Sequence, residues 1–264
     1  MIDHLVDWTA AARPGRRVGH AIEMHELIGS TNDRARELLA DPAVDGVVVV
    51  ADAQSAGRGR RGRTWLSPAG RSLSMSAAVR PRLGARDAWQ LALGTALAAA
   101  EACDGAGAEV GLKWPNDLVA RSGDKLGGIL IETAVEGEQL NGAVIGIGIN
   151  LDWRRDDMPE EIRETTCSLE DLAGGPIDRV ELLGRLLDGL SDEIDQIELG
   201  ESPLARYRAR CWTLGTDVRV AVGGATIEGR AVDLDDTGGL IVDSGARRHV
   251  VAAGEVVMLR GDRA

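Results

Sequence analysis

The sequence contains no phenylalanine and only three cysteines. So few cysteines argue against classes of protein that depend on zinc sites or on several disulfides. Cys103, Cys167 and Cys211 are far apart and form no CxxC pair, so neither a zinc site nor a disulfide framework is indicated. The four histidines, His4 among them, show no HExxH or comparable ligand spacing. We therefore interpret these seven residues as structural or incidental, and we expect no protein-bound metal.

Long hydrophobic runs are also missing. No apolar stretch approaches the roughly 18 residues that a membrane-spanning helix needs, and the chain does not open on a basic segment followed by an apolar one. Hydrophobic residues make up 44% of the 264 residues, which is enough for a core. The sequence therefore predicts a cytoplasmic protein without a membrane partner, built as one large domain or as one large and one small domain.

Lysine is nearly absent. Of the 30 basic residues only Lys113 and Lys125 are lysine, which leaves 28 arginines. A GC-rich genome explains this bias, and a high-salt cytoplasm would also suit an acidic, lysine-poor surface. The net charge of −12 repels nucleic-acid phosphate on average, so any site for anions must be a local basic patch.

The order of apolar and turn segments predicts alternating strands and helices, followed by a small all-β unit. We expect strands at 20–28, 46–53, 72–79 and 142–151, a hairpin of 109–120 with 126–136, and helices at 33–40, 88–103, 178–199 and 203–211. Ser30 to Asn32 and Asp87 are candidate helix caps, and Asp178 with Glu181 is a candidate capping box. The domains predicted are 1–211 and 212–264, the second a small barrel.

An arginine- and glycine-rich loop, GRGRRGR at 57–63, is the strongest local exception to the acidic composition. Its glycines allow tight backbone turns, its arginines offer forked donors to phosphate or carboxylate, and Trp65 offers a flat face for a ring. The run also satisfies GxGxxG, but Pro68 and Gly70 forbid the long helix that a dinucleotide site needs. A solvated basic loop, in contact with nucleic acid, is the other interpretation.

Four further segments carry candidate chemistry: Ser30–Thr31–Asn32, KWPND at 113–117, KLGGILIE at 125–132 and GIGIN at 146–150. Glycine in a strand often permits close approach of a ligand, and Pro115 fixes the directions of its neighbours. Each segment taken alone also has a plain interpretation, as a helix cap, as turn chemistry or as close backbone packing.

Together, and in this order, the five segments resemble the biotin protein ligase family. The resemblance implies an α/β (α+β) catalytic domain related to class II aminoacyl-tRNA synthetases, with a mixed sheet, and a C-terminal SH3-like β-barrel. It implies a ligase that activates biotin with Mg²⁺-bound ATP to biotinyl-5′-AMP and transfers biotin to a lysine of a biotin carboxyl carrier protein domain of a carboxylase. Family members that repress transcription carry a helix-turn-helix domain of some 60 residues before the STN segment. Only 29 residues precede Ser30, so we expect no DNA partner.

The resemblance also assigns residues to roles. Those implied for biotin are Ser30, Thr31, Gln54, Gly57, Arg58, Arg60, Lys125, Gly128, Leu130 and Gly146. Those implied for ATP are Arg58, Arg60, Arg61, Arg63, Trp65, Lys113, Asn116, Lys125 and Asn150. Lys125, Arg60, Asp117 and Lys113 are the candidate catalytic residues, with Lys125 between carboxylate and α-phosphate and Asp117 near the incoming amine.

Three alternatives remain at this point. A lipoate or octanoate ligase shares the fold and the acyl-adenylate chemistry, although the GRGRRG loop and KWPND favour biotin. A biotin-accepting carrier would need an MKM sequence, which neither lysine has. A nucleic-acid-binding module conflicts with the net charge. The sequence leaves the oligomeric state open, with a homodimer as one alternative.

Overall fold

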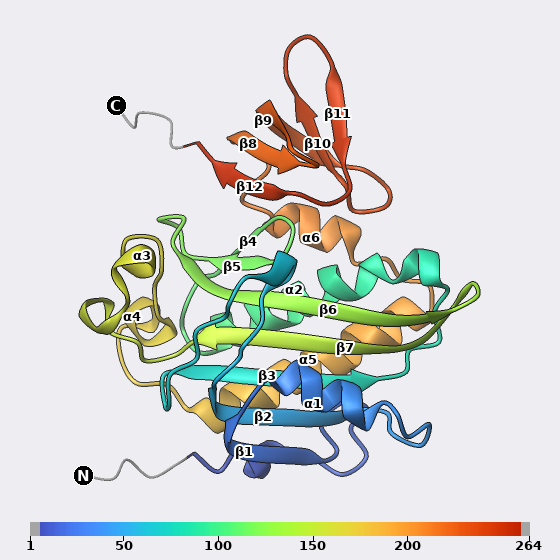
Figure 1. Ribbon diagram of the computed structural model, residues 1–264, viewed down its shortest axis with the longest axis vertical. Helices are drawn as coiled ribbons and strands as arrows, with labels where there is room; N and C mark the ends of the chain where they lie inside the picture. The colour runs from blue at the N-terminus through green and yellow to red at the C-terminus, as the bar shows by residue number, and fades with distance from the viewer. Residues whose placement is uncertain (1–5, 260–264) are drawn as a thin grey trace.

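Two β-sheets form the framework of the protein in a computed structural model that describes residues 6–259. His4 therefore lies outside the described residues. The larger sheet has seven strands and the smaller has five, and Figure 1 shows the smaller sheet stacked against one end of the larger unit. The predicted class, a mixed α/β domain with a small β domain after it, is confirmed.

The seven-stranded sheet carries the site described below. Its strands, in spatial order, are β1 (Ile22–Ile28), β2 (Val47–Gln54), β3 (Ser72–Val79), β7 (Gln139–Asn150), β6 (Lys125–Glu136), β5 (Asp117–Val119) and β4 (Gly111–Lys113). Strands β1 and β2 are parallel and every other neighbouring pair is antiparallel. Strand β3 is buried throughout and β7 nearly so, which explains why both read as continuous runs of apolar and small residues.

Helices cover both faces of this sheet (Figure 1). Helix α1 (Thr31–Leu38) lies on one face against β2, β3 and β7. On the other face α2 (Trp89–Gly105) and α5 (Arg179–Glu198) pack side by side. Helix α2 buries eleven of its residues, as its apolar composition predicted. The shorter helices are α3 (Glu160–Arg163), α4 (Leu169–Ala173) and α6 (Leu204–Arg210). No helix in the described range is long and apolar enough to span a membrane.

The C-terminal sheet is antiparallel, in the order β11 (Arg248–Val251), β10 (Leu240–Asp243), β9 (Ala225–Leu234), β8 (Asp217–Val222) and β12 (Glu255–Met258). It is held to the larger unit by Trp114, whose indole N–H donates to the Gly238 carbonyl at 2.9 Å and whose backbone N–H donates to Thr213 Oγ1 at 3.0 Å. The domain boundary that we predict between residues 211 and 212 falls between α6 and β8 and stays a prediction.

Three sequence-based expectations need correction. Asp87 does not cap α2: it lies in a 3-10 turn, and the helix begins at Trp89 after an Ala88 cap. Segment 109–120 is not one strand, because the turn at 114–116 divides it into β4 and β5, and only β5 forms the hairpin with β6. Ser30 stands at the N-cap of α1, but its side chain makes no capping hydrogen bond, and the helix already includes Thr31. By contrast, Asp178 caps α5, accepting from Glu181 N at 2.9 Å. The side chain of Glu181, the second half of the predicted capping box, accepts from Arg185 instead.

Candidate active site

The floor of the candidate site is a recessed patch of the seven-stranded sheet. Directly paired residues on neighbouring antiparallel strands share a face, so the register across β3, β7 and β6 defines rows of side chains. Two adjacent rows are Ser74–Gly148–Gly128 and Ser76–Gly146–Leu130. Five of these six side chains are hydroxymethyl groups or a hydrogen atom, so the sheet is hollow at this point.

The glycines of β7 make room for other side chains of the protein. A Cβ on Gly148 would lie 2.5 Å from Cε2 of Trp65, and a Cβ on Gly146 would overlap Oδ1 of Asn32. The close approach of a ligand to Gly146 that the sequence predicts stays a prediction. In this structure the indole of Trp65 lies over Gly148 and the amide of Asn32 lies over Gly146, and both side chains form walls of the site.

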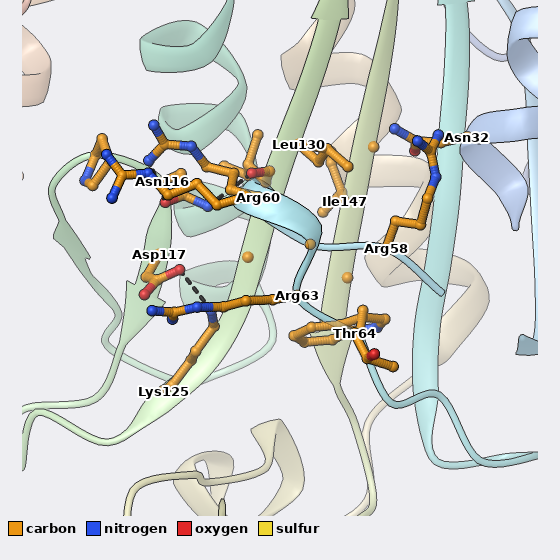
Figure 2. A pocket seen from close by; sticks show the side chains of 18 of the residues that line it. Asn32, Arg58, Arg60, Arg63, Thr64, Asn116, Asp117, Lys125, Leu130 and Ile147 are labelled. Atoms are coloured by element: carbon orange, nitrogen blue, oxygen red, sulfur yellow. Dashed lines mark hydrogen bonds and ion pairs between the residues drawn. The ribbon is translucent and has the colours of Figure 1, made fainter. Parts of the chain in front are cut away.

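A cavity of about 230 Å³ lies above this floor. The lining comes from α1 and its cap, the arginine loop, the KWPND turn, strands β6 and β7, and the start of β12. The predicted residues that line it are Ser30, Thr31, Gln54, Arg58, Arg60, Arg61, Arg63, Trp65, Lys113, Asn116, Asp117, Lys125, Gly128, Leu130 and Gly146. Segments more than 200 residues apart in the chain therefore converge on one site. Figure 2 labels ten of the lining residues, from Asn32 to Ile147.

Gly57 and Asn150 are the two predicted site residues outside this lining. The Gly57 carbonyl accepts from Trp65 N at 2.9 Å and closes the base of the loop. Asn150 is buried, and its Nδ2 donates to the Cys167 carbonyl at 3.2 Å. The ligand contacts that we assigned to these two residues stay predictions.

The arginine loop is a closed hairpin in which Gly59 N donates to the Arg63 carbonyl at 2.7 Å. At its tip Arg61 has φ 56°, a left-handed conformation that is uncommon outside glycine. The loop's arginines have different partners. Arg60 donates to Asn116 Oδ1 at 3.1 Å, and Arg63 forms an ion pair with Glu255 of the C-terminal sheet. The loop is thus attached to both units of the chain.

Lys125 is fixed through both its backbone and its side chain. Its ammonium Nζ lies 2.7 Å from Asp117 Oδ1 and 5.9 Å from the centroid of the Trp65 ring. Its backbone N–H donates to the Thr165 carbonyl at 2.7 Å, and its carbonyl accepts from Cys167 N at 3.0 Å. A single positive charge is therefore held at the cavity wall beside a carboxylate and an aromatic ring (Figure 2).

Burial tunes two further cations of the site. Desolvation lowers the pKa of Lys113, and neighbouring Lys125 lowers it further while Asp117 opposes the shift. Desolvation also lowers the pKa of Arg60. Cations held away from water interact more strongly with an incoming anion than exposed ones do, so the site is prepared for a polyanionic ligand.

Several residues that line the first cavity were not predicted from the sequence. Gly254, Glu255, Val256 and Val257 contribute from the C-terminal sheet, and Asn32, Thr64, Met75 and Ile147 contribute from the larger unit. Asn32 carried a signal, because it belongs to the STN segment. Nothing local in residues 254–257 pointed to this site.

A second cavity, of about 210 Å³, lies next to the first. The two cavities share six lining residues: Arg60, Trp114, Pro115, Asn116, Ile129 and Leu130. Its other walls are largely apolar, with Trp89 and Leu93 from α2 and Ile131 from β6. Thr237 and Gly238, from the turn between β9 and β10, and Ala252, from the bend after β11, complete the lining. The two cavities meet where Arg60 contacts Asn116.

The described residues contain no group of three or more histidine, cysteine, aspartate or glutamate side chains placed to hold a metal ion. Within residues 6–259, Asp117 is the carboxylate that faces both Lys125 and the cavity.

Comparisons with known proteins show matches to two protein-family models and to curated ligases. Residues 24–150 match the model of the Biotin/lipoate A/B protein ligase family, and residues 213–259 match that of the Biotin protein ligase C terminal domain. The chain is 40% identical to the biotin–[acetyl-CoA-carboxylase] ligase of Mycobacterium tuberculosis, with 89% of each chain covered. It is 35% identical to the ligase of the same name from Paracoccus denitrificans, covering 86% of this chain and 96% of that one.

Solved structures agree. The biotin protein ligase of Aquifex aeolicus in complex with biotin and ATP superposes with a TM-score of 0.76 at 29% identity, covering 91% of this chain and 99% of that chain. The fold and site thus define a ligase of the biotin and lipoate class. The C-terminal match and the identity to the curated relatives go further: the chain belongs to the biotin protein ligase family.

Proposed function

We propose that this chain joins biotin to ATP, forming biotinyl-5′-AMP and pyrophosphate, and then transfers biotin to a lysine of the carrier domain of a biotin-dependent carboxylase. The observation that carries the proposal is the arrangement of Lys125, Asp117 and Arg60 around one cavity that also contains Thr31 and Gln54. The related Aquifex aeolicus ligase binds biotin and ATP, and that of Leishmania major is known with biotinyl-5-AMP.

In the first step a carboxylate oxygen of biotin attacks the α-phosphorus, and the bond from that phosphorus to the oxygen of the departing pyrophosphate breaks. Two anions must approach each other, so charge neutralisation and positioning supply most of the catalysis. We assign Lys125 to the carboxylate and α-phosphate, and Arg60 and Lys113 to the polyphosphate. The desolvation of both Arg60 and Lys113 supports this assignment.

At the other end of the cavity, Ser30, Thr31 and Gln54 would hold the ureido ring of biotin. Thr31 N donates to Gln54 Oε1 at 2.8 Å, so the Gln54 amide nitrogen is the group that would donate to a ligand carbonyl. Leu130 and the backbone of Gly146, which both line the cavity, would contact the apolar part of the ring system. Trp65, lying on Gly148, would face the nucleotide.

In the second step the lysine amine of the carrier attacks the acyl carbon, AMP leaves with the electrons of the broken C–O bond, and the amine loses a proton. Asp117 is the carboxylate that we place to orient this amine or accept its proton. The second cavity supplies a route, because its apolar walls suit the methylene stem of a lysine and it ends at Arg60 and Asn116.

Magnesium is expected to arrive bound to the phosphate oxygens of ATP, as substrate. Neutralisation of phosphate charge is the chemistry that the ion would supply. Asp117 is ion-paired with Lys125, so we assign it to the reacting groups. A cytoplasmic location is part of the same proposal and is supported by three buried cysteines without a disulfide.

The test is biotin-dependent ATP–pyrophosphate exchange without any carrier. We expect exchange with biotin and little or none with lipoate or octanoate. Exchange with lipoate or octanoate, but not with biotin, would move the chain to the other branch of its class. Transfer to a purified carrier domain, followed by mass spectrometry of the modified lysine, tests the second step separately.

A further inference from the structure

Glu132, on β6 two residues beyond Leu130, is the shared acceptor of a cluster that the chemistry above does not use. Its carboxylate accepts from Asn32 Nδ2 at 2.7 Å, from Arg36 Nη2 at 2.6 Å, and from both terminal nitrogens of Arg58 at 2.8 and 3.2 Å. The side chain of Glu132 is only 27% exposed. A strand, a helix and the arginine loop thus meet on one carboxylate.

Arg58 is occupied by this cluster. In addition to Glu132, its Nη2 lies 2.9 Å from Asp33 Oδ1, and Arg36 contacts the same Asp33 oxygen at 2.7 Å. Two carboxylates and two guanidinium groups balance in charge, so Arg58 needs no ligand anion for neutralisation. In Figure 2 Arg58 points toward Asn32, at the far end of the cavity from Lys125.

Asn32 extends the cluster to the proposed ring-binding end of the cavity. Its Oδ1 accepts from the Ser76 hydroxyl at 2.6 Å, and that hydroxyl lies 2.8 Å from Thr31 Oγ1. Thr31 is in turn bonded to Gln54 through its backbone N–H. A continuous series of hydrogen bonds therefore runs from the arginine loop through Glu132 to Thr31 and Gln54.

We propose that Glu132 is a positioning residue that couples closure of the arginine loop to the biotin end of the site. By holding Arg58 it keeps the loop over the cavity, and by holding Asn32 it orients Thr31. This inference rests on the proposed function, in which Thr31 contacts biotin. Lys125 and Arg60 contact the reacting groups instead, so loss of Glu132 weakens biotin binding more than it slows the chemistry.

The test uses Glu132→Gln in the full chain, which keeps the size of the side chain and removes its charge. Loss of one charge-assisted hydrogen-bond pair should raise KM for biotin about tenfold in pyrophosphate exchange. The accompanying change in kcat should be smaller, about threefold at most. Without ligand, trypsin should cleave faster at the arginines of the loop. Glu132→Asp, which keeps the charge at shorter reach, should fall between wild type and Glu132→Gln.

Glu136→Gln is the matched control, because Glu136 is an exposed residue of the same strand and lines neither cavity. It should leave both readouts unchanged. The coupling is tested with Arg58→Gln: in that background Glu132→Gln should raise KM by a smaller factor than it does in the wild type, since the contact between Glu132 and Arg58 is already absent and only the contacts with Asn32 and Arg36 remain to be lost.

Wild-type KM for biotin and wild-type cleavage rates in Glu132→Gln would overturn the inference, as would a fall in kcat alone. If Glu132→Gln does not fold, the same criteria apply to Glu132→Asp. Absence of biotin-dependent exchange in the wild type would refute the proposed function instead. The cleavage comparison needs no biotin and still tests the role of Glu132 in that case.

Discussion

The indole of Trp65 lies directly on the backbone of Gly148, so close that a methyl group at position 148 would come within 2.5 Å of the ring. The ring forms a wall of the cavity, and Lys125 Nζ lies 5.9 Å from its centroid. Trp65 can lie at this position because residue 148 of β7 is a glycine, with a hydrogen atom in place of a side chain.

Gly148→Ala should displace Trp65 and impair nucleotide binding. We expect KM for ATP to rise at least about tenfold and the free energy of unfolding to fall by about 1–3 kcal/mol, the usual cost of overpacking. Gly142→Ala, on the same strand, is the control, because its new Cβ would meet its nearest atom at an ordinary 3.5 Å. Exchange kinetics and thermal unfolding measure both effects. Equal KM values in the two variants would show that Trp65 does not contact the nucleotide.

Lys125→Arg should keep the fold but lower the adenylation rate by several hundred-fold. The ammonium fits between Asp117 Oδ1, 2.7 Å away, and the face of Gly128, where an added Cβ would be 3.4 Å from Nζ. A planar, forked guanidinium is wider and cannot converge on two oxygens in the same space. Removal of a preorganised electrostatic donor costs about 10²–10³ in rate.

Lys113→Arg should also be impaired, though less. Pre-steady-state formation of biotinyl-5′-AMP measures both variants. A folded Lys125→Arg enzyme within a few-fold of wild type would mean that the charge alone suffices and that the survival of two lysines among 28 arginines is coincidence.

The alkaline limb of the pH–rate profile should report Lys113. Burial lowers its pKa below the ordinary lysine value, so its charge is lost earlier as pH rises, and exchange should decline before ordinary lysines titrate. In the same window the unfolded chain binds more protons than the folded one, so this group makes stability rise with pH. Lys113→Arg should be slower at neutral pH but lack this limb. An unchanged limb in Lys113→Arg would assign it to another group.

Ala252→Trp should obstruct the second cavity and separate the two steps of the reaction. Ala252 lines that cavity at its edge on the C-terminal sheet, whereas its exposed neighbour Ala253 does not. We expect Ala252→Trp to preserve pyrophosphate exchange and to slow biotin transfer to a carrier domain at least about tenfold, because the amine loses its route. Ala253→Trp should preserve both. Normal transfer in Ala252→Trp would place the route of the amine elsewhere.

The sequence predicted those elements of the fold that depend on residues close together in the chain. Strand β3 begins and ends at the predicted residues, 72 and 79, since its run of apolar and small residues is bounded by turn residues. Helix α5 has the Asp178 cap that was expected, and it spans Arg179–Glu198 within the predicted range 178–199. Each of the five motifs was recognisable from its own turn or glycine signal, and the structure brings residues of all five to one cavity.

The sequence could not predict features that depend on contacts between distant segments. Residues 254–257 reach the cavity through contacts between distant segments, among them the hydrogen bond from Trp114 to Gly238 and the ion pair of Arg63 with Glu255. Helices α3 and α4 have four and five residues, too few for a periodic pattern. Glu132 ends a recognised motif, but its role depends on Arg58 and Asn32, 74 and 100 residues away.

The two rows of small residues on the sheet also determine the distance between the two ends of a bound acid. Thr31 contacts the row of Ser76 and Gly146, while the ammonium of Lys125 lies beside Gly128, in the next row. Successive rows on one face are about 7 Å apart along the strands, and β3 and β6 are separated by about 10 Å across the sheet. The span between the head group and the carboxylate of an acid is therefore measured by backbone geometry. Side-chain substitutions can change how tightly an acid is held. The length of acid whose carboxylate reaches Lys125 is determined by the spacing of the hydrogen-bonded strands.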